Sequence, residues 1–310
     1  MPSPPVVIGV SYKGGSGRTT TMANVAYRLA LSPVNSVCMV DLDLAAPTLG
    51  AVLELAGYES GTKVGRGIHS FLPNPQTGNR QREVRALLED KELLVDVQSN
   101  CASPGVRDAL RSLGDDPSFR VLLGEAEWRD VASPDSLDMP INEVVETLAS
   151  RWPYTFVDVG AGTDSQLLAL THHHRPAERT WAVFYRWTPQ HVRGTAHLIE
   201  QLLAGNVPAE MIRTVRVARG TPPPDLEGTP VEIAAARWVH DQDAETERIA
   251  SDVGLDKYPV TDIPRSEILY WRDGIIATEA LPTLADASRE LIDSYRKLAK
   301  DLFGDGVVVL

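Results

Sequence analysis

Residues 11–20 hold the groups with the clearest chemical purpose in this chain. They read Ser-Tyr-Lys-Gly-Gly-Ser-Gly-Arg-Thr-Thr, directly after an apolar segment at 6–10 and before a helical pattern at 19–31. Glycines between a strand and a helix let several backbone N–H groups turn toward one anion, and the helix N-terminus adds the positive end of its dipole. The run therefore predicts a phosphate-binding loop in which Gly14, Gly15 and Gly17 face the phosphates.

This run departs in two places from the general phosphate-loop pattern G-x-x-x-x-G-K-[ST]. Tyr12 stands where the first glycine is expected, and Arg18 stands where the lysine is expected. A lysine ammonium is a compact charge, whereas a guanidinium is a planar fork. We expect nucleotide binding to survive the exchange, and whether fast hydrolysis survives it stays open. A dinucleotide-binding fingerprint fits worse, because Thr20 occupies the place of its third glycine.

Hydroxyl and carboxylate groups that suit a metal ion accompany the loop. Thr19 is placed to ligate a Mg²⁺ ion that bridges phosphates, and Thr20 can cap the turn and donate to a phosphate oxygen. Asp41 and Asp43 close a second apolar segment at 36–41. One of these carboxylates could hold a Mg²⁺-bound water while the other orients an attacking water.

A third acidic position closes the apolar segment at 154–159. Asp158 lies near the end of this segment and is followed by Gly160 and Gly162. An acidic residue at the end of a buried strand is suited to contact a metal ion through water. Glycine allows the closest backbone approach to a ligand, so the N–H group of Gly160 or Gly162 could sense a terminal phosphate.

The elements that must position these groups follow from the alternation of apolar and helical patterns. Strands are predicted at 6–10, 36–41, 92–97, 154–159, 180–185, 212–218 and 258–263. Helices are predicted at 19–31, 80–90, 105–113, 141–151, 164–171, 189–204, 265–272 and 284–303. Continuous apolar strands that alternate with helices indicate an α/β fold, a mainly parallel twisted sheet with helices on both faces. Ligands of such sheets bind at the carboxyl ends of the strands, where the loop lies.

We predict one domain over 1–310. The stretches near 57–78 and 115–140 are rich in glycine, proline and polar residues, and we expect them to be surface elaborations. Residues 220–230 are rich in proline and predict a stiff loop.

Composition and charge narrow the class of protein. With 43% hydrophobic and 23% charged residues the chain is globular, and no apolar run approaches the roughly 18 residues of a membrane span. Without a secretory signal pattern and with two cysteines, it is expected to be cytoplasmic. The net charge of −12 excludes a basic coat for nucleic acid. However, residues 171–220 hold seven arginines and three glutamates, a local charge of +4, and could contact DNA or an acidic partner.

Taken together, these motifs resemble the MinD/ParA family of deviant Walker A P-loop ATPases. The family pattern Lys-Gly-Gly-x-Gly-Lys-Thr-[Thr/Ser] corresponds to residues 13–20, its Asp-x-Asp motif to Asp41 and Asp43, and its D-x-x-x-G switch to 158–162. Residues 262–266 are similar to its adenine-side loop, and 295–299 are similar to its closing helix.

The resemblance implies an ATP-dependent dimerisation switch with slow Mg²⁺-dependent hydrolysis, which positions or regulates a protein partner or cargo. Lys13 would reach the phosphates of the partner in a nucleotide-bound homodimer, and Asp43 would position the attacking water. Thr19, Asp41 and Asp158 would support Mg²⁺. The nucleotide-binding residues would be Lys13, Gly14, Gly15, Ser16, Gly17, Arg18, Thr19, Thr20, Gly162, Arg219 and Pro264.

Three departures from the family keep alternatives open. Arg18 in place of the lysine resembles a branch of regulatory ATPases of bacterial systems, and it also fits a nucleotide-bound scaffold with little or no hydrolysis. The asparagine that reads adenine is not evident in 215–220, so Arg219 could stack on the base instead, and a GTP-binding relative is a further alternative. Residues 297–310 carry only two basic side chains, so membrane anchoring is not expected.

Overall fold

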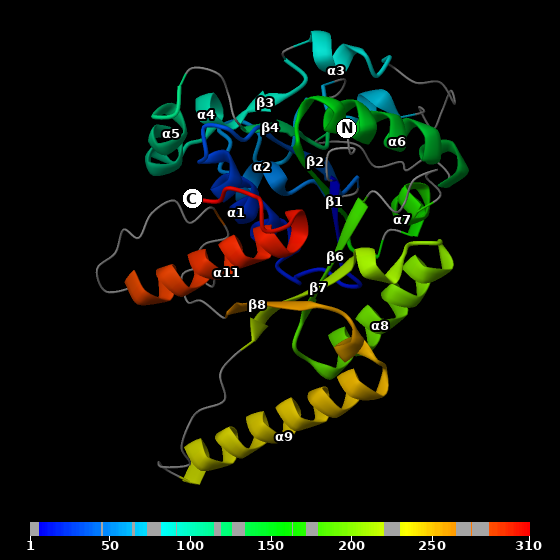
Figure 1. The fold of residues 1–310 in the computed structure, drawn as a ribbon, viewed down its shortest axis with the longest axis vertical. Helices are drawn as coiled ribbons and strands as arrows, with labels where there is room; N and C mark the ends of the chain where they lie inside the picture. Colours follow the sequence, from blue (N-terminus) through cyan, green and yellow to red (C-terminus); the bar gives the residue numbers. More distant parts are fainter. Residues whose placement is uncertain are drawn as a thin grey trace.

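A computed structural model of the chain shows one eight-stranded sheet between two layers of helices (Figure 1). The strand order is β3-β4-β2-β5-β1-β6-β7-β8, and all neighbouring strands are parallel except the antiparallel pair of β3 and β4. The structure describes residues 6–44, 46–63, 66–72, 82–90, 92–114, 119–125, 134–162, 164–171, 179–219, 230–264, 274 and 285–310.

The strands are short and mostly buried, as expected for a parallel sheet that is covered on both faces. Their bounds are Val6–Val10 for β1, Val37–Leu42 for β2, Val95–Asp96 for β3, Phe119–Leu122 for β4, Tyr154–Val159 for β5, Arg179–Arg186 for β6, Ile212–Arg219 for β7 and Val260–Pro264 for β8.

Helices cover both faces of this sheet. The longer ones are α1 at Arg18–Ala30, α5 at Pro104–Arg111, α6 at Pro134–Arg151, α7 at Asp164–Thr171, α8 at Pro189–Ala204, α9 at Pro230–Asp252 and α11 at Ala285–Phe303. The short ones are α2 at Leu49–Val52, η1 at Ile68–Phe71, α3 at Ala86–Glu89, α4 at Val97–Asn100, η3 at Ala209–Met211 and η4 at Leu255–Lys257. The helix α9 projects from the body of the fold (Figure 1).

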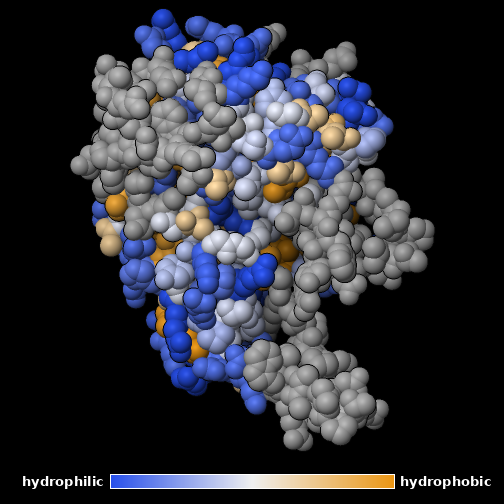
Figure 2. Space-filling view, turned by 180° about the vertical axis from the view of Figure 1, so that it is seen from behind, coloured by the Kyte–Doolittle hydropathy of each residue, from blue (hydrophilic) through white to orange (hydrophobic). Residues whose placement is uncertain are grey.

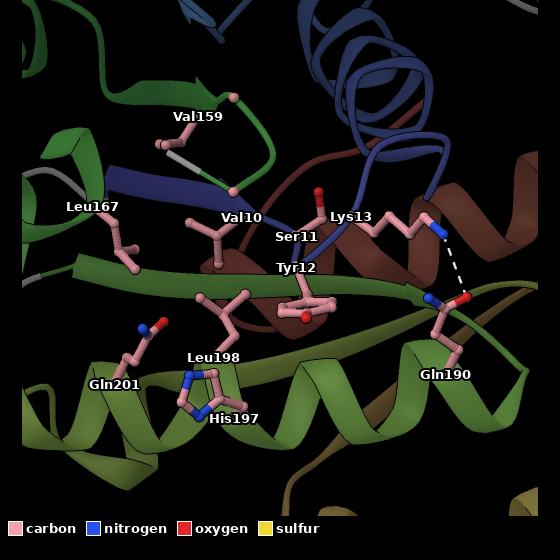
Figure 3. A pocket seen from close by; sticks show the side chains of 12 residues that line it. Val10, Ser11, Tyr12, Lys13, Val159, Leu167, Gln190, His197, Leu198 and Gln201 are labelled. Carbon is pink, nitrogen blue, oxygen red and sulfur yellow. Dashed lines mark hydrogen bonds between the residues drawn. The ribbon is translucent and has the colours of Figure 1, made fainter. Parts of the chain in front are cut away.

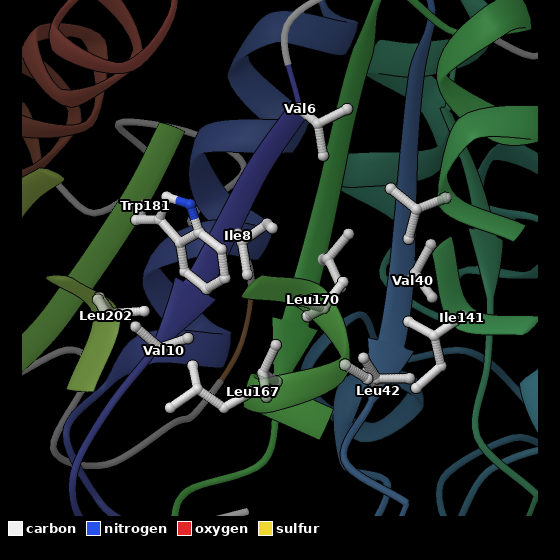
Figure 4. Packing of buried hydrophobic residues seen from close by; sticks show 14 of the residues in the cluster. Val6, Ile8, Val10, Val40, Leu42, Ile141, Leu167, Leu170, Trp181 and Leu202 are labelled. Carbon is white, nitrogen blue, oxygen red and sulfur yellow. The ribbon is translucent and has the colours of Figure 1, made fainter. Parts of the chain in front are cut away.

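Two hydrophobic clusters hold the layers together. Because side chains alternate along a strand, Val7 of β1 packs toward α1 and α11, whereas Ile8 packs toward α6, α7 and α8. Figure 4 shows this second cluster, where Trp181 of β6 and Leu170 of α7 lie beside the β1 side chains. The two clusters fix the carboxyl ends of β1, β2 and β5 next to one another.

The surface agrees with the polar composition. On the face seen in Figure 2, hydrophilic side chains predominate among the described residues, and hydrophobic ones form small separate groups. No helix in the described part of the chain is long and apolar enough to cross a bilayer.

The predicted fold class is confirmed, and several local predictions need correction. Of the described residues in the helix predicted at 80–90, only Ala86–Glu89 are helical, as α3. Residues 119–122 form β4 inside the sheet, within the stretch that was expected to be a surface elaboration. The strand predicted at 92–97 is reduced to the two residues of β3. The helix α9, at Pro230–Asp252, was not predicted. The helix predicted at 265–272 lies outside the described residues.

The predicted elaboration near 57–78 is only partly a surface feature. Phe71 and Leu72 pack into the cluster under α6, and the N–H group of Ile68 donates to the Leu123 carbonyl at the end of β4. These contacts bring this segment to the carboxyl edge of the sheet.

Candidate functional site

The loop between β1 and α1 forms an open cradle lined by glycines. A Cβ atom on Gly14 or Gly15 would meet no atom within 4 Å, so the space beside both residues is open. Gly15 and Gly17 have φ angles of 73° and 78°, in the left-handed region that favours glycine. Gly17 is also the N-cap of the 13-residue α1, whose first backbone N–H groups have no acceptor within the helix. Backbone N–H groups at such a helix N-terminus can bind an anion.

The polar side chains of the loop differ in their exposure. Ser16 and Thr20 are buried, Thr19 is half-buried at the start of α1, and Lys13 is exposed. Among the polar side chains of the loop, those of Thr19, Lys13 and Tyr12 are therefore accessible enough to meet a ligand without a rearrangement. The others support the loop from within.

The strand β7 holds the end of the loop in place. A Cβ atom on Gly17 would lie 2.8 Å from Cγ1 of Val217, closer than real Cβ contacts come. The glycine therefore serves both the left-handed turn and the close approach of the loop to β7.

Two predicted carboxylates lie side by side on neighbouring strands. Asp41 of β2 pairs in register with Asp158 of β5, and both side chains are about 1% exposed. The Asp41 carboxylate accepts backbone hydrogen bonds from Asp43 at 3.2 Å and from Leu49 at 3.1 Å. Burial, together with the adjacent charge of Asp158, raises the pKa of Asp41 to about 8.

Arg18 is bonded to the second of these carboxylates. Its Nε atom forms an ion pair with Oδ1 of Asp158, and its Nη1 atom donates to the Ser11 hydroxyl at 2.9 Å. The Arg18 side chain is only 6% exposed. The guanidinium thus supplies the positive charge next to Asp158 in the place where a Mg²⁺ ion was expected. Sequence patterns predicted both residues at the site, but not that they bond to each other.

Asp43 reaches the loop that follows β5. A Cβ atom on Gly160 would lie 3.0 Å from the Asp43 carboxylate. A residue other than glycine at position 160 would therefore displace this carboxylate. The Oδ1 atom of Asp43 also accepts a hydrogen bond from the Ala46 N–H group at 3.0 Å. Gly162, with φ of 67°, ends the same turn near the backbone of Tyr12.

The beginning of α8 packs against the loop, a feature that sequence patterns did not predict. The Lys13 ammonium donates to Oε1 of Gln190 at 3.3 Å (Figure 3). The Tyr12 ring lies on Gly194, where a Cβ atom would be 2.0 Å from the ring. A cavity of about 520 Å³ opens beside these contacts between the loop, α7 and α8. An isolated glycine within a helical pattern was the available signal for this packing.

The strand ends β7 and β8 form the side where a nucleotide base is predicted to bind. Arg219 pairs with Pro264 in the backbone register of these strands, after a β-bulge between Val217 and Arg219. The side chain of Arg219 and the residues 265–273 lie outside the described part of the structure.

A buried histidine braces the segment that carries Asp43, and sequence patterns missed it. The Nδ1 atom of His69 accepts the Glu125 N–H group at 3.1 Å, and Nε2 lies 3.3 Å from the Leu44 carbonyl. This bonding requires a neutral ring with its proton on Nε2. Burial lowers the pKa of His69 from 6.5 to about 4.

We expect His69 to make an unfavourable contribution to the free energy of unfolding in mild acid, opposite in sign to that of Asp41, whose raised pKa favours the folded state as the pH falls. The unfolded chain takes up a proton below pH 6.5, but the folded ring does so only near 4. The contribution of His69 is therefore complete above pH 6.5 and is lost as the pH falls toward 4, by on the order of 1 kcal/mol at pH 5.5. Urea unfolding at pH 7.5 and 5.5 measures it. Relative to the unaltered protein, His69→Gln should gain stability at pH 5.5 compared with pH 7.5, and replacement of the exposed His197 should leave the pH dependence unchanged. An unchanged pH dependence in His69→Gln would contradict the assignment.

The arginine-bearing stretch at 171–220 is only partly available for an external partner. Arg179 is buried and donates to Asn142 at 2.7 Å, and Arg216 is buried against Asp262. Arg186 and Arg193 are exposed. The internal use of two arginines reduces the positive charge that this stretch can offer to a partner.

A parallel sheet between two helical layers, with a glycine cradle between β1 and α1, defines the P-loop NTPase fold with three α/β/α layers. Solved structures with this fold resemble nearly the whole chain. They include MinD from Aquifex aeolicus (TM-score 0.57, 18% identity, 99% of both chains). They also include a ParA-family ATPase from Chlorobium tepidum TLS (0.57, 17%, 94% of this chain and 98% of that one). A third is an ATP complex of a McdA variant from Cyanothece (0.59, 11%, 100% of both chains).

The resemblance predicted from the motifs is therefore confirmed at the level of the fold. No protein-family model matches the chain, and no curated protein matches it by sequence.

Proposed function

We propose that this chain binds ATP at residues 13–20 and acts as a nucleotide-dependent switch like the MinD and ParA-family proteins whose fold it shares. One observation carries the proposal: the open cradle of Gly14 and Gly15 lies at the carboxyl edge of the sheet beside Asp41, Asp43 and Asp158. The similar McdA structure from Cyanothece is an ATP complex, which supports this choice of ligand.

Magnesium binding would require a change at Arg18. The oxygen donors of Thr19, Asp41 and Asp158 suit Mg²⁺, but Arg18 is bonded to Asp158 and the pKa of Asp41 is about 8. When bound, the ion would neutralise phosphate charge. We propose that the phosphates draw Arg18 from Asp158, which frees this carboxylate to orient a metal-bound water. Asp43 would then orient the attacking water.

A second candidate is a nucleotide-bound scaffold with little or no hydrolysis. The buried ion pair of Arg18 and Asp158 favours it, because a guanidinium that stays on Asp158 would keep this carboxylate from the metal. A third alternative is a GTP-binding protein, because an asparagine that would read adenine is not evident in the sequence. Comparison of ATP binding with GTP binding tests this alternative.

The switch would work through assembly. We propose a homodimer in the nucleotide-bound state, in which the exposed Lys13 leaves Gln190 and reaches the phosphates of the second subunit. A protein partner or cargo would recognise this dimer. The exposed Arg186 and Arg193 are the candidates for a salt-sensitive contact with DNA.

Size-exclusion chromatography with ADP, ATP and a non-hydrolysable ATP analogue tests the switch. We expect a dimer with ATP and with the analogue, and a monomer with ADP. Asp43→Ala should leave ATP binding intact and slow phosphate release about tenfold, or about 1.4 kcal/mol in the barrier. Asp305→Ala near the C-terminus is the matched control and should change neither. A protein that stays monomeric and retains no nucleotide would overturn the proposal, and no phosphate release from the unaltered protein would favour the scaffold.

A further inference from the structure

Four side chains form a linked cluster at the carboxyl ends of β6, β7 and β8. We define it as the Arg216 cluster, made of Trp187, Arg216, Asp243 and Asp262. Arg216 donates to both carboxylate oxygens of Asp262, at 2.5 and 2.8 Å. Its guanidinium carbon lies 4.4 Å from the centroid of the Trp187 ring. The Trp187 N–H group donates to Asp243 of α9 at 2.5 Å.

The cluster holds Arg216 from two directions. Asp262 binds the guanidinium in its plane, and the indole of Trp187 covers it from above, an arrangement that suits a planar cation and not an ammonium. Arg216 is 9% exposed. Burial alone lowers its pKa, but the hydrogen bonds and charge of Asp262 outweigh burial and raise it. The charged form is therefore retained inside the fold.

A buried ion pair is weak evidence that a fold gains stability from it. The best-documented role of such a pair is to select one register or conformation among several. Here it joins β7 to β8, which is the last strand of the sheet and pairs only with β7 within the described part of the chain. Arg216 and Asp262 are direct partners in the register of these two strands. A slip of one residue would turn every side chain of β8 to the opposite face, and this pair opposes the slip.

The register matters because it places the residues that come next on both strands. Immediately beyond Arg216, the Val217 side chain packs at the position of Gly17 in the cradle. After the bulge, Arg219 pairs with Pro264. The cluster thus lies behind the edge where the base of a nucleotide would sit, on the face of the sheet opposite α1.

We propose that Arg216 is a positioning residue for the nucleotide base. It holds β8 in the one register with β7 that places Pro264 beside Arg219 at the base side of the cradle. A slip of β8 would leave β7 paired to β6, with Val217 still against Gly17 of the phosphate loop. The inference rests on the proposed nucleotide site. It assigns to this cluster the placement of the strand ends expected at the base and leaves the phosphates to the glycine loop.

Calorimetric titration with ATP and with inorganic tripolyphosphate, both with Mg²⁺, tests this assignment. Arg216→Lys keeps the charge and loses the fork and the stacking. We expect its Kd for ATP to rise about tenfold, while its Kd for tripolyphosphate changes less than about twofold. Arg213→Lys, at the opposite end of β7, is the matched control, because this arginine donates only to the nearby carbonyls of Glu210 and Ile212 among its described bonds.

Asp262→Asn provides a second variant that keeps Arg216 and its stacking on Trp187. It should show the same selective loss of ATP affinity, and thermal unfolding of each variant verifies that it folds. An equal loss for both ligands, or no loss for ATP, would overturn the inference. An unaltered protein that binds neither ligand would overturn the proposed nucleotide site instead.

Discussion

Arg18→Met is expected to lower the free energy of unfolding by about 3–5 kcal/mol at pH 7, because it removes one partner of a buried ion pair. Arg18 and Asp158 are 6% and 1% exposed, so the remaining carboxylate would stay buried without its cation. Its register neighbour Asp41 is a second buried acid that cannot replace the lost charge. Urea unfolding followed by circular dichroism measures the change.

Three controls separate the ion pair from other effects of the substitution. Asp158→Asn combined with Arg18→Met removes both charges and should recover most of the lost stability. Arg18→Lys keeps the charge and should cost about 1 kcal/mol, for the lost Ser11 hydrogen bond. Arg248→Met breaks an exposed ion pair with Asp252 and should cost less than about 0.5 kcal/mol. A loss of that small size in Arg18→Met would contradict the buried pair.

Gly17→Ala is expected to abolish measurable nucleotide binding and to destabilise the fold by about 2–4 kcal/mol. The left-handed backbone at φ 78° costs an alanine about 1–3 kcal/mol. The new Cβ atom would also lie 2.8 Å from Val217, so the loop or β7 must shift. Either shift turns the first N–H groups of α1 away from a bound phosphate. Calorimetric titration with ATP and urea unfolding measure the two effects.

Two matched variants divide this effect into its causes. Gly15→Ala meets the same backbone strain at φ 73° but no atom within 4 Å, so it should destabilise the fold less than Gly17→Ala. Val217→Ala combined with Gly17→Ala removes the clash and should restore only the part of the stability that the clash had cost. If Gly17→Ala binds ATP as the unaltered protein does, the loop is not the phosphate site.

Local patterns predicted most strands of the sheet and the residues that lie at its carboxyl edge. The apolar runs predicted β1, β2, β5, β6, β7 and β8 within one or two residues at each end, because β-branched or aromatic residues recur in each of these strands. The segment β4 was missed since it is only four residues long and contains Arg120, and its partner β2 is far away in the sequence. Few of the described side chains of α9 are buried, so the apolar pattern of this helix is weak. The buried ones are Thr246, Ile249 and Ala250.

The sequence by itself determined which residues gather at the carboxyl edge. The glycines of 14–17 follow β1, Asp41 and Asp43 lie at the end of β2, and Asp158 lies at the end of β5. Parallel strands bring these carboxyl ends together. These residues come together because of the order of strands and loops along the chain. Local composition is enough to predict that order. The cradle, the carboxylates and the fold class all result from that order.

Only the tertiary structure decided which of these groups bond to one another. Arg18 meets Asp158 across 140 positions of sequence, and Arg216 meets Asp262 across 46. The partner of a buried charge depends on strand register and on which side chains exclude water around it, and no local pattern records either. For the same reason, the residues next to His69 in the sequence give no indication that its pKa is lowered to about 4. Burial and long-range pairing therefore set the charge state of the site, while local sequence set its position.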